Sequence, residues 1–137
     1  MNEDEFQKIV VGWLDHALPF GCIYHHSPNE GKRHVSYKLR LKKLGMKSGW
    51  PDIEIFAPTK YFFNGLGRPL FIELKAPKRG TISPAQKEVQ KQLQDADCLI
   101  VTANKLSIIK AFLSHSIELK DNGNTRAFEQ LAAMNGA

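Results

Sequence analysis

Two short segments in which apolar and polar side chains alternate, each stopped by a proline, constrain the fold of this chain most. Residues 52–57 alternate up to Pro58, and residues 70–76 alternate up to Pro77. A period of two is typical of β-strands, and proline cannot continue the hydrogen-bonded ladder of a sheet. The linker at 64–69 is rich in Gly, Pro and Asn, so an antiparallel pair is the economical arrangement.

Helical patterns surround these strands. Residues 4–18 carry apolar side chains at intervals of three and four, which predicts an amphipathic helix. The sequence Ser83-Pro84-Ala85-Gln86 combines an N-cap serine, a proline at the first helical position and a glutamine that completes a capping box. It predicts a helix that runs to about Asp95. A further helix is expected at 104–115, and short strands are expected at 22–25 and 99–101.

Two other segments are less regular. Residues 35–44 alternate as in a strand, but we interpret them as a short helix that ends at Gly45. From Asp121 onward the chain is rich in Asn and Gly, with one weak helical patch near 127–134. We therefore expect one domain over 1–116 and a C-terminal tail over 117–137, partly disordered or forming a short helix.

Composition excludes several classes of protein. The chain has 137 residues, of which 42% are hydrophobic and 24% charged, which is typical of a globular domain. No stretch is apolar for the roughly 20 residues that a membrane-spanning helix needs, and the N-terminus is acidic, unlike a signal peptide. Cys22 and Cys98 lack the spacing of a zinc site. We expect a cytoplasmic protein with no membrane partner.

Positive charge is concentrated in one segment. The chain has a net charge of +5, yet residues 31–51 alone carry seven basic side chains and no carboxylate. Such a cluster can be a solvated face, but interleaved Tyr37 and Trp50 favour a polyanion such as nucleic acid as the partner. The candidate nucleic-acid contacts are Lys32, Arg33, Lys38, Arg40, Lys42, Lys43 and Lys47.

The most informative polar residues lie on the two central strands. A period of two places Glu73 and Lys75 on one face, and antiparallel pairing brings Asp52 beside Glu73. Two carboxylates and the backbone carbonyl of Leu74 form a hard oxygen site suited to Mg²⁺ or Mn²⁺. With a nearby lysine, such a site hydrolyses phosphodiesters. The alternative is a solvated strand face with ordinary charged side chains.

Several short blocks accompany these carboxylates in a fixed order. With Pro51-Asp52 and Glu73-Leu74-Lys75 as its central elements, the chain resembles the PD-(D/E)XK nucleases, and within them the virus-type replication-repair nuclease (VRR-NUC) family. The resemblance spans roughly residues 3–113. The blocks that carry it are Glu5-Phe6-Gln7, Trp13-Leu14, Asn29-Glu30-Gly31, Gly45 to Asp52, Phe71 to Pro77, and Ser83 to Gln86.

The resemblance implies an α/β fold with a restriction-endonuclease-like core, in which a central mixed sheet is flanked by helices in the order αβββαβ. It makes Asp52 and Glu73 metal ligands and Lys75 the catalytic lysine. Gln86 matches the helical glutamine of the family's site, although a capping role explains it equally well and one side chain is expected to serve one role at a time. For the first-helix glutamate we favour Glu5 over Glu3, because Glu5 stands in a Glu-x-Gln sequence.

The activity implied is a Mg²⁺- or Mn²⁺-dependent DNA endonuclease. Stand-alone members of the family resemble Holliday junction resolvases that act as homodimers, so we expect a four-way junction as the substrate and a dimer as the active form. The alternatives are a nickase or flap-type nuclease on other branched DNA, and a noncatalytic nucleic-acid-binding domain. His25 and His26 have no carboxylates at suitable spacing and are left outside the catalytic centre.

Overall fold

The computed structural model describes residues 1–27, 35–78 and 80–136. Within these ranges, each helix and strand expected from the sequence is present, and the ambiguous segment after residue 34 is a helix. No helix among the described residues is long and apolar enough to cross a membrane. The elements are α1 (Glu3–Ala17), β1 (Ile23–His26), α2 (Val35–Lys43), β2 (Ile53–Phe56), η1 (Thr59–Tyr61), β3 (Leu70–Leu74), α3 (Pro84–Asp95), β4 (Leu99–Ala103), α4 (Leu106–Ser116), η2 (Lys120–Gly123) and α5 (Arg126–Met134).

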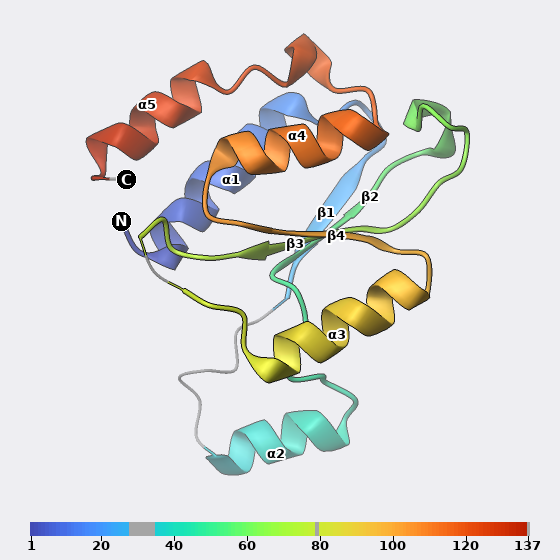
Figure 1. Ribbon diagram of the computed structural model, residues 1–137, viewed down its shortest axis with the longest axis vertical. Helices are drawn as coiled ribbons and strands as arrows, with labels where there is room; N and C mark the ends of the chain where they lie inside the picture. The colour runs from blue at the N-terminus through green and yellow to red at the C-terminus, as the bar shows by residue number, and fades with distance from the viewer. Residues whose placement is uncertain (28–34, 79, 137) are drawn as a thin grey trace.

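The four strands form one mixed sheet in the order β1-β2-β3-β4 (Figure 1). The first three strands run antiparallel, and β4 pairs with β3 in parallel after the α3 crossover. In the β2–β3 ladder Ile53 lies opposite Ile72. Asp52 therefore reaches the end of the sheet opposite Glu73, as the antiparallel pairing predicted.

Helices cover the sheet on both faces, and the hydrophobic core lies on one of them. α1 and α4 pack on that face, while α3 packs on the other and α2 lies beyond α3 (Figure 1). All five residues of β3 are buried because the strand is central and covered on both sides. The core side chains with no exposed surface include Val10, Trp13, Leu14, Ile53, Ile55, Leu70, Ile72, Leu74, Ile109 and Leu113. The α/β class and the helix-flanked mixed sheet are confirmed.

The C-terminal segment differs from the tail expected from the sequence. The short helix near 127–134 is present as α5, and it packs against α1 rather than standing apart. The buried indole of Trp13 donates from Nε1 to the Gly123 carbonyl over 3.3 Å, and His16 contacts Asp121 over 3.1 Å. These contacts join residues 117–136 to the first helix of the core.

Candidate active site

Asp52 and Glu73 lie side by side where β2 begins and β3 ends. The Asp52 carboxylate accepts a hydrogen bond at Oδ2 from the Leu74 N–H over 2.7 Å, which fixes its orientation against β3. Glu73 is only 2% exposed, and its Oε2 has no hydrogen-bond partner among the described residues. A buried carboxylate oxygen without a partner is costly, so this atom is suited to a ligand.

Gln86 links the Glu73 carboxylate to Lys75. Its Nε2 donates to Glu73 Oε1 over 2.6 Å, while its Oε1 accepts from Lys75 Nζ over 2.9 Å. The same Oε1 also accepts from the Ser83 N–H over 2.9 Å, which completes the capping box of α3. The expectation that Gln86 serves one role at a time is therefore wrong, because an amide oxygen has two lone pairs and the amide nitrogen lies at the other end.

Lys75 lies beside this pair. Its Nζ is 3.4 Å from Glu73 Oε1, and its side chain is only 13% exposed. The period of two that placed Glu73 and Lys75 on one face is confirmed. A partly buried ammonium group held by one amide and one carboxylate has a fixed position next to the Asp52–Glu73 pair.

The loop before Asp52 packs directly on the start of α3. Gly49 has a φ of +81°, and a Cβ added there would lie 2.6 Å from the Ala85 carbonyl carbon and 2.7 Å from the Gln86 nitrogen. Only glycine allows this approach of backbone to backbone. The contact sets the distance between the strand that carries Asp52 and the helix that carries Gln86.

Burial changes the acidity of the carboxyl groups. Loss of solvent, reinforced by the charge of Asp52, raises the pKa of Glu73 to about 8, although Lys75 opposes the change. Desolvation also raises the pKa of Asp52, while the hydrogen bond from Leu74 opposes the change. Closely placed carboxyl groups with raised pKa values are typical of sites that bind a cation or move a proton.

On the first helix the structure brings Glu3 to the cleft, whereas Glu5, the favoured candidate, does not line it. Glu5 is exposed and its Oε2 accepts from the Asn2 N–H over 2.9 Å, so it belongs to the capping box of α1. Glu3 is half-buried, and its pKa is raised first by desolvation and then by the charge of Asp52. It lies on the side of α1 that faces the site.

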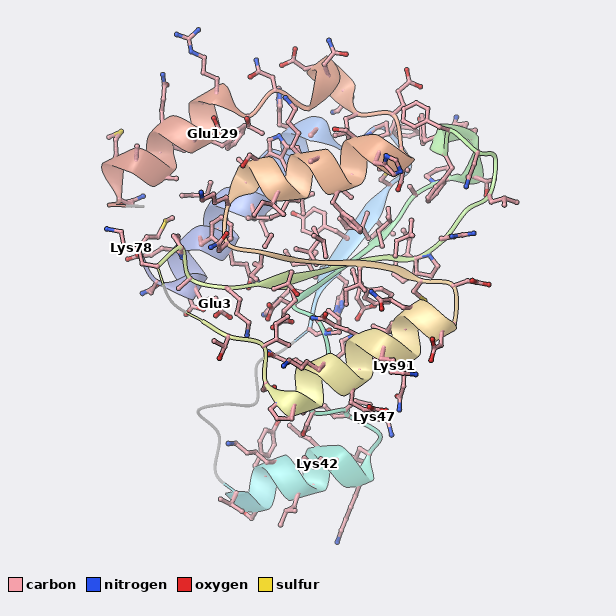
Figure 2. All side chains as sticks on the ribbon, in the orientation of Figure 1. Glu3, Lys42, Lys47, Lys78, Lys91 and Glu129 are labelled. Carbon is pink, nitrogen blue, oxygen red and sulfur yellow. The ribbon has the colours of Figure 1, made fainter. Side chains whose placement is uncertain are left out.

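A cleft of about 680 Å³ opens over these residues. Lys42 and Lys47 line it from α2 and from the connection after α2, and Glu3 lines it from α1 (Figure 2). The carboxylates and the positive charges expected to hold a polyanion therefore share one cavity. We call it the basic cleft; the residues that line it are Glu3, Ser27, Lys38, Lys42, Gly45, Met46, Lys47, Ser48, Gly49, Trp50, Asp52, Glu73, Ser83, Ala85 and Gln86.

Two described basic residues of that segment do not line the cleft. Arg40 and Lys43 are exposed on α2 and do not appear among its described lining residues. Lys32 and Arg33 lie outside the described residues, as does the Asn29-Glu30-Gly31 block.

Sequence reasoning missed a polar cluster beside the site. Glu54, interpreted as structural, accepts at Oε1 from the Trp50 indole N–H over 2.9 Å and from the Ser27 hydroxyl over 3.0 Å. His25 lies 3.9 Å from the same carboxylate, and His26 Nδ1 is 3.0 Å from the Asp52 carbonyl. The sequence showed only that Asp52 and Glu54 share a strand face. It did not show which side chains donate hydrogen bonds to Glu54.

The donor set fits a hard divalent cation that keeps much of its water. Among the described residues no three His, Cys, Asp or Glu side chains form a closed metal cage. Mg²⁺ does not require one, since one or two carboxylates together with substrate phosphate and water complete its coordination. Asp52 and the orphaned oxygen of Glu73 are such a pair. The Leu74 carbonyl stays a predicted ligand.

Comparison with solved structures identifies a similar protein. A solved structure described as a VRR_NUC domain protein is 28% identical to this chain, with a TM-score of 0.58, over 82% of this chain and 88% of the other. No family model and no curated protein matches the chain. The likeness covers more than four fifths of each chain.

Proposed function

We infer that the chain belongs to the VRR-NUC family of nucleases, and on this premise we propose that it is a Mg²⁺- or Mn²⁺-dependent endonuclease that hydrolyses phosphodiesters in branched DNA. One observation carries the proposal. Asp52 and Glu73 lie together, and Gln86 joins Glu73 to Lys75, at a cleft that Lys38, Lys42 and Lys47 also line. Acidic groups for a cation and basic groups for a polyanion are both needed to cut a phosphodiester.

Each residue has a part that follows from its contacts. The lysines of the basic cleft attract the phosphates of the substrate and hold the strand near the carboxylates. Lys75, fixed by Gln86 and Glu73, places a positive charge where negative charge develops on the phosphate, and it can orient the attacking water. Gln86 holds the Lys75 amine and the Glu73 carboxylate at a fixed distance from each other, because its own position is fixed by the helix cap.

Asp52 and Glu73 would hold the cation. A bound divalent ion supplies a Lewis acid that withdraws charge from the phosphate and makes water a better nucleophile near neutral pH. Asp52 is oriented for this by the Leu74 N–H, and Glu73 brings a buried oxygen without a protein partner among the described residues. Their raised pKa values support the assignment, because a nearby cation would stabilise the charged carboxylates that burial disfavours.

We propose a four-way junction as the substrate and a homodimer as the active form. A junction needs two symmetric cuts, and each chain supplies one site, so a two-fold dimer provides the second. Sedimentation velocity at micromolar concentration, with and without a junction, tests the dimer. A monomer in both conditions would contradict the resolvase activity and favour a flap-type nuclease.

The proposed activity is tested with four-way junction, flap, nicked and linear duplex DNA in Mg²⁺, in Mn²⁺ and in EDTA. We expect cleavage of branched DNA in either metal and none in EDTA. Asp52→Asn should lose both cleavage and calorimetric metal binding, because it removes the charge of a ligand. Asp95→Asn, the same change at an exposed residue of α3, is the matched control. Cleavage in EDTA, or full activity of Asp52→Asn, would refute the proposal.

A further inference from the structure

We propose that Trp50 is a stacking surface for an unpaired nucleobase next to the phosphodiester to be cut. The inference rests on the proposed nucleic-acid substrate and goes beyond it, because it names what the site recognises other than phosphate. Trp50 stands two residues before Asp52 and lines the same cleft. The chain has a second tryptophan, Trp13, which is buried in the core with no exposed surface.

The polar edge of the Trp50 ring is already satisfied within the protein. Its Nε1 donates to Glu54 Oε1 over 2.9 Å, and the Ser27 hydroxyl donates to the same oxygen over 3.0 Å. The ring also packs perpendicular to that of the buried Phe71, with 5.7 Å between the ring centroids. Two contacts therefore fix the indole. Its remaining surface, the part that lines the cleft, is apolar and aromatic.

An apolar ring among lysines suits a nucleic-acid strand better than it suits phosphate alone. Lys38, Lys42 and Lys47 line the same cleft and match the charge of the backbone, whereas an indole offers nothing to a phosphate once its N–H is used. Aromatic side chains bind nucleic acid by stacking on bases. This stacking contributes affinity whatever the base sequence, because every base has an aromatic face. Fixing the ring beforehand reduces the loss of side-chain freedom on binding.

Stacking on Trp50 requires the base to be unpaired. In a duplex the faces of each base are covered by its neighbours, so a protein ring reaches a face only at a flap, a branch point or a single strand. The basic cleft has about 680 Å³, the size of pocket that encloses one drug-sized molecule, so it suits about one or two nucleotides rather than a duplex. Trp50 thus couples the cutting position to a branch.

An abasic scan tests the contact without any cleavage. A flap-bearing DNA is prepared with a single abasic residue at each position in turn around the branch, and binding is measured by fluorescence anisotropy in EDTA. For the wild-type protein we expect a loss of about fivefold or more in affinity at one or two adjacent positions. Trp50→Leu should bind the intact DNA more weakly and lose this position dependence, whereas Trp50→Phe keeps a ring and should keep it.

A second measurement does not depend on how well Trp50→Leu folds. Titration of the wild-type protein with a single-stranded oligothymidylate should quench tryptophan fluorescence, because Trp50 lines the cleft while Trp13 is buried. Trp50→Phe, which retains Trp13 alone, should show no quenching. Equal quenching in both proteins, or a flat abasic profile for the wild type, would overturn the inference.

Failure of this inference is distinguishable from failure of the proposed function. Metal-dependent cleavage together with a flat abasic profile would refute base stacking and leave the nuclease in place. A position-dependent abasic profile without cleavage in any metal would refute the nuclease and leave Trp50 as the base contact of a nucleic-acid-binding domain.

Discussion

Gln86 donates from Nε2 to Glu73 Oε1 over 2.6 Å, from the first turn of α3 to the buried carboxylate of β3. Because the other end of the same amide caps α3 and accepts from Lys75, the start of this helix and the candidate site form one hydrogen-bonded unit. A change that moves the start of α3 will therefore move the groups proposed for chemistry.

Gln86→Glu should separate capping from the site. Glutamate suits the capping box and the helix N-terminus, so α3 itself should be preserved. The new carboxylate has no N–H to donate, so the 2.6 Å hydrogen bond from Gln86 Nε2 to Glu73 Oε1 is lost. We expect a destabilisation of about 1–3 kcal/mol in metal-free protein and at least tenfold slower cleavage. Gln94→Glu, the same change at an exposed residue of α3, is the control. Near-wild-type kinetics of Gln86→Glu would show that Gln86 only caps the helix.

Gly49→Ala and Gly45→Ala form a matched pair. Both glycines have positive φ, so both substitutions place a side chain in a disfavoured conformation at about 1–2 kcal/mol. Only at Gly49 would the new Cβ also meet the backbone of Ala85 and Gln86, whereas at Gly45 nothing lies within 4 Å. Chemical unfolding should show a clearly larger loss for Gly49→Ala, accompanied by slower cleavage. Equal losses would show that the loop does not need its close approach to α3.

The raised pKa of Glu73 predicts how stability depends on pH in EDTA. The pKa is about 8 in the folded chain against an ordinary value of 4.5, so between these values the folded state retains a proton that the unfolded state releases. This contribution is present at low pH and is lost as pH rises toward 8, with a slope that approaches about 1.4 kcal/mol per pH unit. Glu73→Gln does not titrate and should flatten the fall in urea-unfolding free energy between pH 5 and 8. Glu118→Gln, an exposed control, should keep the wild-type slope.

The sequence was sufficient to predict the helices and strands and to place Asp52 beside Glu73. Strand alternation, closing prolines and the Ser83 capping box are local signals, and they predicted β2, β3 and α3 closely. Antiparallel pairing of the two strands then placed Asp52 opposite Glu73 without any knowledge of the rest of the fold.

What the sequence could not provide depends on packing between distant elements. Glu3 and Glu5 lie on different sides of one helix, and which side meets the site depends on how α1 sits on the sheet. The structure shows that Asn2 and Glu5 form a capping box, a local role that the preference for Glu5 did not take into account. The hydrogen bond between Trp50 and Glu54 depends on the path of the loop before β2, which no periodicity in the sequence predicts.

Lys42 and Lys43 are adjacent on α2 and test which side of that helix meets the substrate. Lys42 lines the basic cleft and Lys43 does not, although both are exposed lysines at the end of α2. Binding to branched DNA in EDTA is measured across a range of salt concentrations. Lys42→Ala should reduce the slope of log affinity against log salt by about one, and Lys43→Ala by clearly less. The opposite order would place the DNA on the outer side of α2.

The central claim is that Asp52, Glu73 and Lys75 form a hydrolytic centre, and Lys75→Ala tests it most directly. Single-turnover cleavage of a four-way junction in Mg²⁺ is measured beside junction affinity in EDTA, with exposed Lys78→Ala as the control. Because Lys75 acts on the reacting phosphate while the basic cleft supplies binding, we predict cleavage slower by about a hundredfold or more, with affinity little changed. Cleavage by Lys75→Ala at the wild-type rate would contradict the account.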